Sequence, residues 1–347
     1  MKKGIRVLCG YVNTGGLAYK LAEGLRKNGI RADSIVIDDH TFAYPYHKKL
    51  SFIGNKPNLV NRLLKYYYFI KHTFRYDVFI FNTRSTMLSK KGDLKILKKL
   101  GKKTAMIYVG CDIRDKNFYL NSPDKYTVCK NCTIEYQEKV DCVMEKKINE
   151  SGVIQENIDA SFAHPFDATI LEEKFHYFYL LLELEDYKPK YETNKRIRII
   201  HAPSDAGIKG TNYVLDAIEK LKKRNLDFEF ELATGKSQSD LKEAIRNSDI
   251  LIDQMVAGWY GLISVEAMAL GKTTVCFLKQ SLYNFIPDIP IINLNPDNLA
   301  EGLEKLINER EKLQSIGMAG RRFAEKYHDY SKNSMNILSI TTGKNLS

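Results

Sequence analysis

Residues 249–278 read DILIDQMVAGWYGLISVEAMALGKTTVCFL, and the order of patterns in this stretch decides the fold. A short apolar run is followed by a loop bracketed by glycines, an apolar segment of helical length and a second short apolar run. A strand, a helix and a second strand in this order form a βαβ unit, whose strands are parallel. We therefore predict a parallel α/β sheet around this stretch.

One carboxylate, Glu266, lies in the middle of the apolar helical segment. An α-helix has about 3.6 residues per turn, so Glu266 falls one turn after Leu262 and one turn before Leu270 and shares their apolar face. Burying a carboxylate without a partner is costly, because its lost hydration is not replaced. Glu266 must therefore meet either a protein donor or the hydroxyl groups of a ligand.

Strand and helix patterns alternate through the rest of the chain in the same way. In the second half, further strands are expected at 196–204, 227–235 and 289–295. The first half repeats the scheme, with strands expected at 5–12, 32–37, 76–82 and 103–110 and helices at 17–29, 58–73 and 93–101. Such alternation indicates repeated βαβ units and doubly wound sheets.

The charged stretch 183–196, ELEDYKPKYETNKR, is the best candidate for a linker between two domains. We predict an α/β protein of two doubly wound, Rossmann-like domains that face each other across a cleft. Ligands of such sheets bind at the carboxyl ends of the strands. The expected parts are an N-terminal domain at 1–187 with a cysteine-rich insertion at about 111–142, a C-terminal domain at 188–326, and a helix or tail at 327–347 that packs back on the N-terminal domain.

Composition limits the classes of protein that fit. With 347 residues, 44% of them hydrophobic, the chain can fill more than one core, and no apolar run is long enough to span a bilayer. We see no export signal, and six cysteines in such a chain favour a reducing cytosol. The net charge of +11 suits contact with anionic partners, although lysines on solvated faces explain it as well, and the charge alone does not identify a partner. We expect a soluble, cytoplasmic protein.

The segment 201–211, HAPSDAGIKGT, follows an expected strand and opens an expected helix. Lys209, Gly210 and Thr211 therefore lie where helix N-terminal amides are exposed, and a lysine beside such amides makes a phosphate site. The alternative is an ordinary βα turn, in which Thr211 caps the helix and Lys209 is solvated.

Four cysteines, Cys111, Cys129, Cys132 and Cys142, form the pattern C-x17-C-x2-C-x9-C. The CKNC step has a spacing common in tetrahedral zinc sites, and thiols gathered in a cytosolic protein favour metal over disulfides. We expect a structural zinc with no open position for catalysis. The alternative is four scattered cysteines without a shared role.

These motifs together resemble a known enzyme family. The KG turn at 209–210 and the GLISVEAMALGK segment at 261–272 resemble the donor-binding domain of GT-B glycosyltransferases, in particular the retaining family-4 group. Residues 93–114, DLKILKKLGKKTAMIYVGCDIR, resemble a stretch in the acceptor domain of a subset of these enzymes, many of them from bacterial surface-polysaccharide clusters. The resemblance covers roughly residues 5–326, with its more specific motifs in the second half.

The resemblance implies a GT-B fold and a retaining hexosyltransferase. Such an enzyme moves a sugar from a UDP- or GDP-linked donor, bound by the C-terminal domain, to a glycan or polyprenyl-linked acceptor, bound by the N-terminal domain. It needs no metal or other cofactor for catalysis. We therefore expect a role in surface polysaccharide synthesis, with peripheral contact to the inner membrane face and no nucleic acid partner.

The resemblance also implies residue roles. Lys209 would meet the donor diphosphate, with the amides of Gly210 and Thr211 beside it. Glu266 would accept hydrogen bonds from the two ribose hydroxyls, and the amides of Gly261 and Leu262 at the helix start would reach the distal phosphate.

The N-terminal domain carries further candidates. The Gly15-Gly16 loop would line the donor site from that side. The arginine that often precedes the KG turn in the family is missing here, and Arg114 is the candidate to supply its charge across the cleft. Asp112 is the nearest candidate for a general base, although capping of the following turn explains this residue as well.

Two further departures from the family pattern affect recognition of the donor sugar. Gly258 stands where many members carry the first glutamate of an E-x7-E pair, and Val109 stands where a histidine is common. Contacts to the sugar hydroxyls therefore do not carry over to this chain.

Two segments of the N-terminal half admit more than one interpretation. Asp38, Asp39 and His40 end an expected strand, and we interpret them as loop residues or as part of the acceptor cleft. Residues 65–76, KYYYFIKHTFRY, interleave aromatic and basic side chains that could contact a lipid headgroup or a polyprenyl carrier. Helix packing explains the same aromatic residues.

Two other functions are weighed against glycosyl transfer. A non-hydrolysing nucleotide-sugar epimerase has the same fold, but it needs a set of acidic and histidine residues in the cleft that we do not find in the sequence. A nucleic-acid-binding protein could use the cysteines as a zinc knuckle together with the positive charge. That function leaves the KGT turn and the EAMALG helix unexplained.

Overall fold

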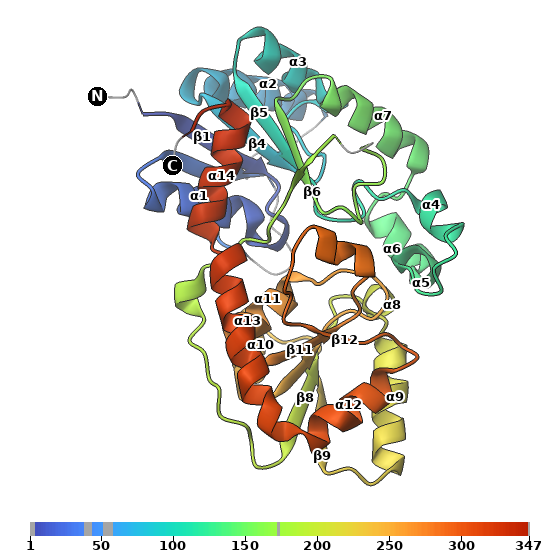
Figure 1. Ribbon diagram of the computed structural model, residues 1–347. Coiled ribbons are helices and arrows are strands. Elements are labelled where there is room, and N and C mark those ends of the chain that lie inside the picture. The colour runs from blue at the N-terminus through green and yellow to red at the C-terminus, as the bar shows by residue number, and fades with distance from the viewer. Residues whose placement is uncertain (1–3, 38–43, 51–57, 172–173, 346–347) are drawn as a thin grey trace. The chain divides into compact units, whose positions relative to one another are not determined.

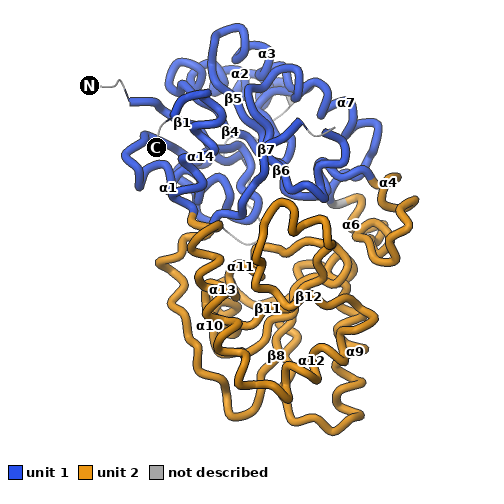
Figure 2. Tube along the Cα trace, viewed as in Figure 1, with its two compact units in different colours: residues 1–115, 140–181, 330–347 blue, residues 116–139, 182–329 orange. Residues whose placement is uncertain are grey.

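The computed structural model describes residues 4–37, 44–50, 58–171 and 174–345. Asp38, Asp39 and His40 lie outside this range. The chain forms two compact units (Figures 1 and 2). Unit 1 contains residues 1–115, 140–181 and 330–347, and unit 2 contains residues 116–139 and 182–329.

Unit 1 is built on a seven-stranded sheet whose neighbouring strands pair in parallel. The strand order β3-β2-β1-β4-β5-β6-β7 is that of a Rossmann-like doubly wound sheet. The strands are β1 (Arg6–Tyr11), β2 (Arg31–Val36), β3 (Lys48–Lys49), β4 (Val78–Asn82), β5 (Lys103–Ile107), β6 (Ala160–Ala163) and β7 (His176–Tyr177).

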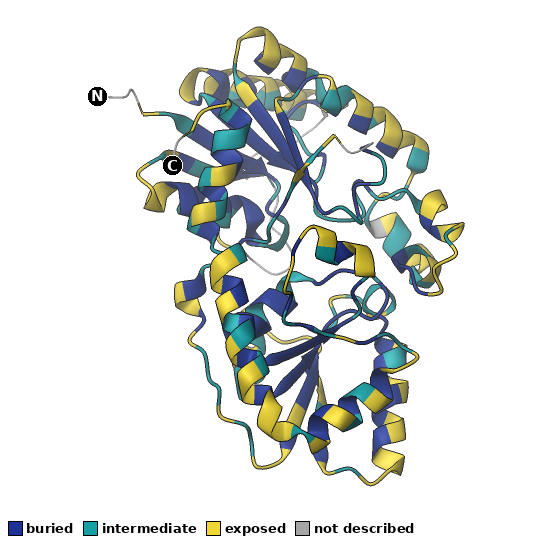
Figure 3. Ribbon diagram, viewed as in Figure 1, coloured by how far each residue is buried: buried dark blue, intermediate teal, exposed yellow. Residues whose placement is uncertain are grey.

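Helices cover both faces of this sheet, so its central strands are buried (Figure 3). One face packs against α1 (Leu17–Lys27) and α14 (Tyr330–Thr342). The other packs against α2 (Asn58–Arg75), α3 (Gly92–Lys99) and α7 (Met144–Gln155). Short 3₁₀ turns lie at η1 (Thr14–Gly16) and η2 (Ser89–Lys91).

The last helix, α14, approaches α1 closely at Gly24. A Cβ atom added to Gly24 would lie 2.5 Å from Ser334 Oγ and 2.6 Å from the Tyr330 carbonyl oxygen. Only glycine fits there without a shift of one helix, and the C-terminal segment is therefore an integral part of unit 1.

Unit 2 is built on a five-stranded parallel sheet of order β12-β11-β10-β8-β9. Its strands are β8 (Ile197–His201), β9 (Phe228–Leu232), β10 (Ile250–Ile252), β11 (Thr273–Cys276) and β12 (Ile292–Asn293). Its main helices are α8 (Ala206–Lys209), α9 (Thr211–Lys223), α10 (Gln238–Asn247), α11 (Leu262–Ala269), α12 (Leu299–Asn308) and α13 (Leu313–Tyr327), with 3₁₀ turns η3 (Leu184–Asp186), η4 (Gln280–Asn284) and η5 (Arg310–Lys312). The prediction of two doubly wound parallel α/β domains is confirmed.

Residues 116–139 belong to unit 2, although the sequence placed them in the N-terminal domain. They form α4 (Lys116–Leu120), α5 (Val128–Asn131) and α6 (Ile134–Lys139). Tyr126 joins the unit 2 core, and its hydroxyl donates to Asp297 Oδ1 at 2.7 Å. Tyr213 on α9 donates to Asn131 Oδ1 at 3.2 Å. The burial of an aromatic side chain in the unit 2 core explains this placement.

The remaining boundaries fall between Leu181 and Leu182 and between Asp329 and Tyr330. The sequence-based boundaries were 187/188 and 326/327. Among the residues described, no helix combines the length and the apolar character needed to cross a membrane.

Candidate active site

The carboxyl edge of the unit 2 sheet has a switch point between β8 and β10. These two strands are neighbours, but the chain continues from β8 to β9 on one side and from β10 to β11 on the other. Connections diverge at such a point and leave a crevice at the carboxyl ends of the strands, where doubly wound folds bind ligands. His201 ends β8, and Asp253 directly follows β10.

Lys209 reaches this switch point from the end of α8. Its ammonium group lies 2.7 Å from Asp253 Oδ1 and 3.1 Å from Gln254 Oε1. The backbone supports this position, since the Met255 N–H donates to the Lys209 carbonyl oxygen at 3.0 Å. The Lys209 side chain is 13% exposed and that of Asp253 is 1% exposed, so the cation faces the surface from a buried anchor.

Asp253 also holds the start of α11. Its Oδ2 atom accepts hydrogen bonds from the Gly261 N–H at 2.7 Å and from the Ser264 hydroxyl at 2.6 Å. Burial alone would raise the pKa of this carboxyl, but the charge of Lys209 and these hydrogen bonds outweigh it and lower the pKa. Asp253 is therefore an ionised, buried carboxylate that ties the KG turn to α11.

Sequence reasoning missed Asp253. The signal that could have found it is its position, because it is a carboxylate that directly follows an apolar strand at the predicted ligand edge.

Gly210 turns the chain from α8 into α9 with a left-handed backbone, φ +70°. A Cβ atom there would lie 3.2 Å from Met255 Cβ, so glycine is favoured by both conformation and space. The predicted KG turn thus begins α9 beside the loop that follows β10.

The Thr211 hydroxyl does not cap a helix, since Gly210 is the N-cap and no side-chain cap bond is formed. His201 Nδ1 lies 2.9 Å from the Ile252 carbonyl oxygen, which can only accept, so this nitrogen carries the proton. Burial lowers the pKa of His201, so the ring is neutral and its Nε2 accepts from the Thr211 hydroxyl at 3.0 Å. These two hydrogen bonds of His201 connect the first residue of α9 to β8 and β10.

The predicted helix that carries Glu266 is α11, with Gly261 as its N-cap and Leu262 as its first residue. In this structure the Gly261 N–H is directed at Asp253. The buried positions of α11 are Ser264, Val265 and Ala267–Ala269. Glu266 is half-buried, so the expectation that it lies on a fully buried face is wrong.

Glu266 Oε1 accepts a hydrogen bond from the Tyr187 hydroxyl at 2.9 Å. Of the two partners considered from the sequence, a protein donor therefore meets this carboxylate in the structure. The donor is a tyrosine hydroxyl, and the side chain remains partly open to solvent.

Gly15 and Gly16 lie in unit 1, in the turn between β1 and α1. Both have left-handed backbones, with φ +61° and +76°. Asn13 organises the turn, because its Nδ2 donates to the Pro45 carbonyl oxygen at 2.8 Å and its Oδ1 accepts from the Tyr19 N–H at 3.2 Å. Their predicted role at the donor site stays a prediction.

Asp112 and Arg114 also lie in unit 1, after β5. Asp112 Oδ1 accepts from the Gly110 N–H at 2.9 Å and the Val109 N–H at 3.2 Å, so this carboxyl group stabilises the preceding turn. Burial, with a further contribution from the nearby Asp167 carboxylate, raises the pKa of Asp112 to about 6. The guanidinium of Arg114 forms an ion pair with Asp167.

The four cysteines of the predicted zinc site are free thiols divided between the units. In unit 1, Cys111 Sγ accepts from Arg114 at 3.2 Å and Cys142 Sγ accepts from Lys147 at 3.2 Å. Cys129 and Cys132 belong to unit 2. Within the described ranges no three histidine, cysteine or acidic side chains are grouped so that they could hold a metal. The zinc site stays a prediction that metal analysis of untagged protein would test.

No protein-family model and no curated protein matches the sequence. Solved structures do match the fold. The structure of sucrose-phosphate synthase from Thermosynechococcus elongatus matches with a TM-score of 0.68 at 12% identity, over 99% of each chain. Anabaena HepE in complex with UDP and glucose matches with a TM-score of 0.63 at 13% identity, over 98% of this chain and 100% of HepE. An alpha-glucosyltransferase in complex with UDP and a 13-mer DNA containing an HMU base matches with a TM-score of 0.64 at 12% identity, over 98% and 99% of the two chains.

These three neighbours are GT-B glycosyltransferases, and the chain has their fold of two parallel α/β units over nearly its full length. The predicted GT-B fold is confirmed. At this level of identity the match establishes the fold, and function has to be argued from the site.

Proposed function

We propose that the protein is a glycosyltransferase that binds a nucleotide diphosphate sugar on unit 2. The observation that carries the proposal is Lys209, a cation pinned by the buried Asp253 at the switch point of the sheet. The fold neighbours in complex with UDP support the nucleotide part of the proposal.

The local electrostatics favour a diphosphate at this edge. The N-termini of α9 and α11 both begin beside the Lys209–Asp253 pair, at Gly210 and Gly261. Helix N-termini carry partial positive charge and unpaired amides, which suit phosphate oxygens. Lys209 adds a full charge, while Asp253 fixes its position from the buried side. The Thr211 amide would complete the phosphate site, whereas the Gly210 N–H donates to the Gly207 carbonyl oxygen at 3.1 Å.

Glu266 is the candidate for recognition of the ribose. A carboxylate accepts hydrogen bonds from two adjacent hydroxyls, and Glu266 is half-buried on α11, so it is partly open to solvent. Tyr187 orients this carboxylate through Oε1. The Leu262 amide at the start of the same helix would face the distal phosphate, whereas the Gly261 N–H, the other amide that the resemblance implies, is held by Asp253.

The reaction we propose is hexosyl transfer with retention at the anomeric carbon. The bond from this carbon to the diphosphate oxygen breaks, and a bond to the acceptor hydroxyl forms on the same face of the sugar. Lys209 and the helix amides would stabilise the leaving diphosphate. The acceptor proton passes to a base or to the departing phosphate oxygen, and Asp112, with its pKa near 6, is the candidate base.

A glycan or polyprenyl-linked acceptor in surface polysaccharide synthesis is the partner that the sequence resemblance favours. Helix α2 supports contact with the inner membrane face, because an apolar stripe along it is exposed to solvent. The stripe consists of Leu59, Leu63, Tyr67, Ile70 and Phe74, of which Phe74 is 80% exposed. Apolar side chains next to bases such as Lys65 and Lys71 are typical of helices that lie in a membrane interface.

Thermal unfolding with UDP and GDP tests the donor proposal. A ligand that binds only the native state stabilises it by about 2.7 kcal/mol at a hundred times its dissociation constant. We expect a raised midpoint with one of the two nucleotides, lost in Glu266→Ala and weakened in Lys209→Ala. Lys222→Ala, on the exposed face of α9, is the control and should keep the full shift. If neither nucleotide raises the midpoint of the wild type, the proposal fails.

A further inference from the structure

Unit 1 contains a second candidate site. It lies at the amino ends of the strands, whereas doubly wound folds bind their ligands at the carboxyl ends. A cavity of about 610 Å³ lies there, lined by Arg6, Arg26, Arg31, Asp33, Arg75 and Tyr76 together with the short loop that precedes β2. Arg6 begins β1 and Arg31 begins β2, so the cavity opens at the amino ends of the parallel strands. It is therefore separate from the carboxyl edge of this sheet, where Gly15 and Gly16 lie.

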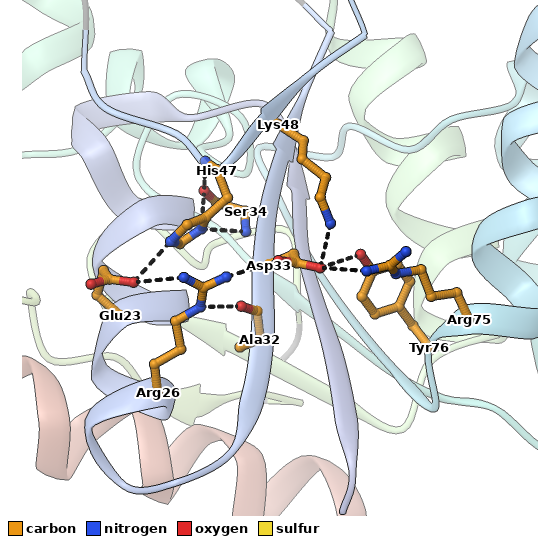
Figure 4. Close-up of polar contacts among 9 residues, drawn as sticks. All are labelled: Glu23, Arg26, Ala32, Asp33, Ser34, His47, Lys48, Arg75 and Tyr76. Carbon is orange, nitrogen blue, oxygen red and sulfur yellow. Dashed lines mark hydrogen bonds and ion pairs between the residues drawn. The ribbon is translucent and has the colours of Figure 1, made fainter.

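Asp33 on β2 organises the basic side chains of the cavity (Figure 4). Its Oδ1 atom accepts from Arg26 at 2.8 Å. Its Oδ2 atom accepts from Lys48 at 2.8 Å and from the Tyr76 hydroxyl at 2.5 Å, and it lies 3.8 Å from an Arg75 nitrogen. One carboxylate thus collects three cations that come from α1, β3 and α2.

A second set of hydrogen bonds holds Arg26 and its neighbours on α1 against β2 (Figure 4). Arg26 donates through Nε to the Ala32 carbonyl oxygen at 2.5 Å. His47 Nδ1 accepts from the Ser34 N–H at 3.0 Å, so the proton of a neutral ring sits on Nε2 and is donated to Glu23 at 2.8 Å. These contacts join α1 and the segment before β3 to β2 and hold Arg26 in place.

The charges that line the cavity do not balance. Four arginines face one carboxylate, Asp33. Burial would raise the pKa of Asp33, but the hydrogen bonds and charges of its partners lower it to about 2, so it is ionised at neutral pH and contributes its full negative charge. Outside the lining, Asp77 offsets Arg6 at 3.3 Å and Glu23 lies 3.5 Å from Arg26. With Lys48 included, positive charge remains in excess.

The guanidinium groups are held in position but not covered. The side chains of Arg6 and Arg26 are each 42% exposed, and that of Arg75 is 54% exposed. Arg31 is exposed as well. Positioned guanidinium groups match phosphate oxygens with two parallel hydrogen bonds, and restraint by Asp33 lowers the entropy lost on binding. The volume lies within the range of small-molecule sites.

We propose that this arginine cavity of unit 1 binds a phosphate-bearing anion with more than one negative charge. Three observations favour such a ligand. Positive charge is in excess, the guanidinium groups are exposed, and hydrogen bonds hold Arg26 in place. The site lies on the amino edge of the sheet and is independent of the donor site proposed on unit 2. The phosphate could belong to a soluble metabolite or to the headgroup of an anionic lipid.

Calorimetric titration with inorganic tripolyphosphate tests the proposal. Wild-type protein should bind it, and the double variant Arg31→Gln and Arg75→Gln should bind at least roughly tenfold more weakly, since each lost charge-assisted contact weakens binding. The matched control, Lys222→Gln and Lys305→Gln on exposed helix faces of unit 2, removes the same charge and should bind as the wild type does. Thermal unfolding verifies that both variants fold.

Vesicle flotation separates the two sources of phosphate. If the arginine variant also loses binding to phosphatidylglycerol vesicles, with phosphatidylcholine vesicles as the neutral reference, the ligand is a lipid headgroup. If it loses tripolyphosphate alone, the ligand is soluble. The proposal is wrong if tripolyphosphate does not bind the wild type. It is also wrong if tripolyphosphate binds the arginine variant as tightly as it binds the wild type.

Discussion

The turn after the first strand differs between the two units, although both sheets are doubly wound. In unit 1, residues 12–16, VNTGG, contain no charged side chain, and backbone and Asn13 hydrogen bonds organise the turn. In unit 2, the corresponding turn contains Lys209, which is tied to the buried Asp253. Gly16 and Gly210 have almost the same left-handed backbone, φ +76° and +70°.

The comparison shows that the two turns share one backbone geometry but place their cations differently. Each turn presents a helix N-terminus, at α1 and at α9, with the partial positive charge that this implies. In unit 2 the turn itself contains a full cation, Lys209, held by a carboxylate that is itself inaccessible to the ligand, whereas the cation next to the unit 1 turn is Lys20 of α1, whose Cε would lie 3.6 Å from a Cβ atom on Gly16. We therefore expect a diphosphate to bind at the unit 2 turn in preference to the unit 1 turn. The following predictions test this expectation.

The largest effect is expected for Asp253→Ala. The change leaves the Lys209 ammonium, the Gly261 N–H and the Ser264 hydroxyl without their shared acceptor. Breaking a buried ion pair by removing one partner costs about 3–5 kcal/mol, so the free energy of unfolding should fall by that amount in urea titrations. Binding of UDP should fall as well, because Lys209 loses its anchor.

Asp253→Asn is the matched control, since it keeps the shape and removes the charge. It should lie between wild type and Asp253→Ala in stability. If the asparagine variant equals the wild type in both stability and UDP binding, the charge of Asp253 is not what positions Lys209.

The second prediction compares the two glycine turns directly. Gly210→Ala and Gly16→Ala each force a side chain into a left-handed backbone, at a cost of about 1–2 kcal/mol. Both added Cβ atoms would also lie 3.2 Å from a neighbouring carbon. Both variants should therefore lose similar stability, whereas only Gly210→Ala should weaken UDP binding in calorimetric titrations. An equal loss of UDP binding in Gly16→Ala would show that the unit 1 turn lines the donor site, as the sequence resemblance implies.

The third prediction concerns the Asp112 carboxyl group of unit 1 under changing pH. The pKa of Asp112 is raised from 3.8 to about 6, so the folded protein binds its proton more tightly than the unfolded chain. The contribution of Asp112 to stability is therefore complete below its unfolded pKa and is lost as the pH rises towards 6. Wild-type stability should fall across this window more than that of Asp112→Asn, measured by urea unfolding at each pH. Parallel curves would contradict the raised pKa.

The smallest effect is expected for Tyr187→Phe. The variant loses the hydrogen bond to Glu266 Oε1 and nothing of the ring packing, which should lower the unfolding free energy by about 0.5–1.5 kcal/mol. UDP binding should change by less than roughly threefold, because the carboxylate itself remains. A loss as large as that of Glu266→Ala would mean that the tyrosine hydroxyl contacts the nucleotide itself.

The sequence predicted the sheet and helix scheme well, because apolar runs and helical periods are local patterns. The strand expected at 196–204 is β8, Ile197–His201, and the helix expected at 58–73 is α2, Asn58–Arg75. The KG turn and the start of α11 both donate hydrogen bonds to Asp253 in unit 2, which is the domain that the motifs indicate.

Long-range partners could not be predicted in the same way. Lys209 and Asp253 are 44 positions apart in sequence, and no spacing rule joins them. Nothing local shows that Tyr126 fills the core of unit 2 or that the Tyr187 hydroxyl meets Glu266. These contacts depend on how helices and loops pack after the sheet has formed.

The docking of α14 on α1 also bears on how the chain can be made and cut. Because Gly24 must meet Ser334 and Tyr330, α1 cannot finish its packing until α14, some 300 residues later, has been synthesised. Removing α14 would expose the apolar face of α1 that packs against it, so this helix is not dispensable. An excised piece starting at Leu182 would in turn lack Tyr126, so neither unit can be obtained by a single cut.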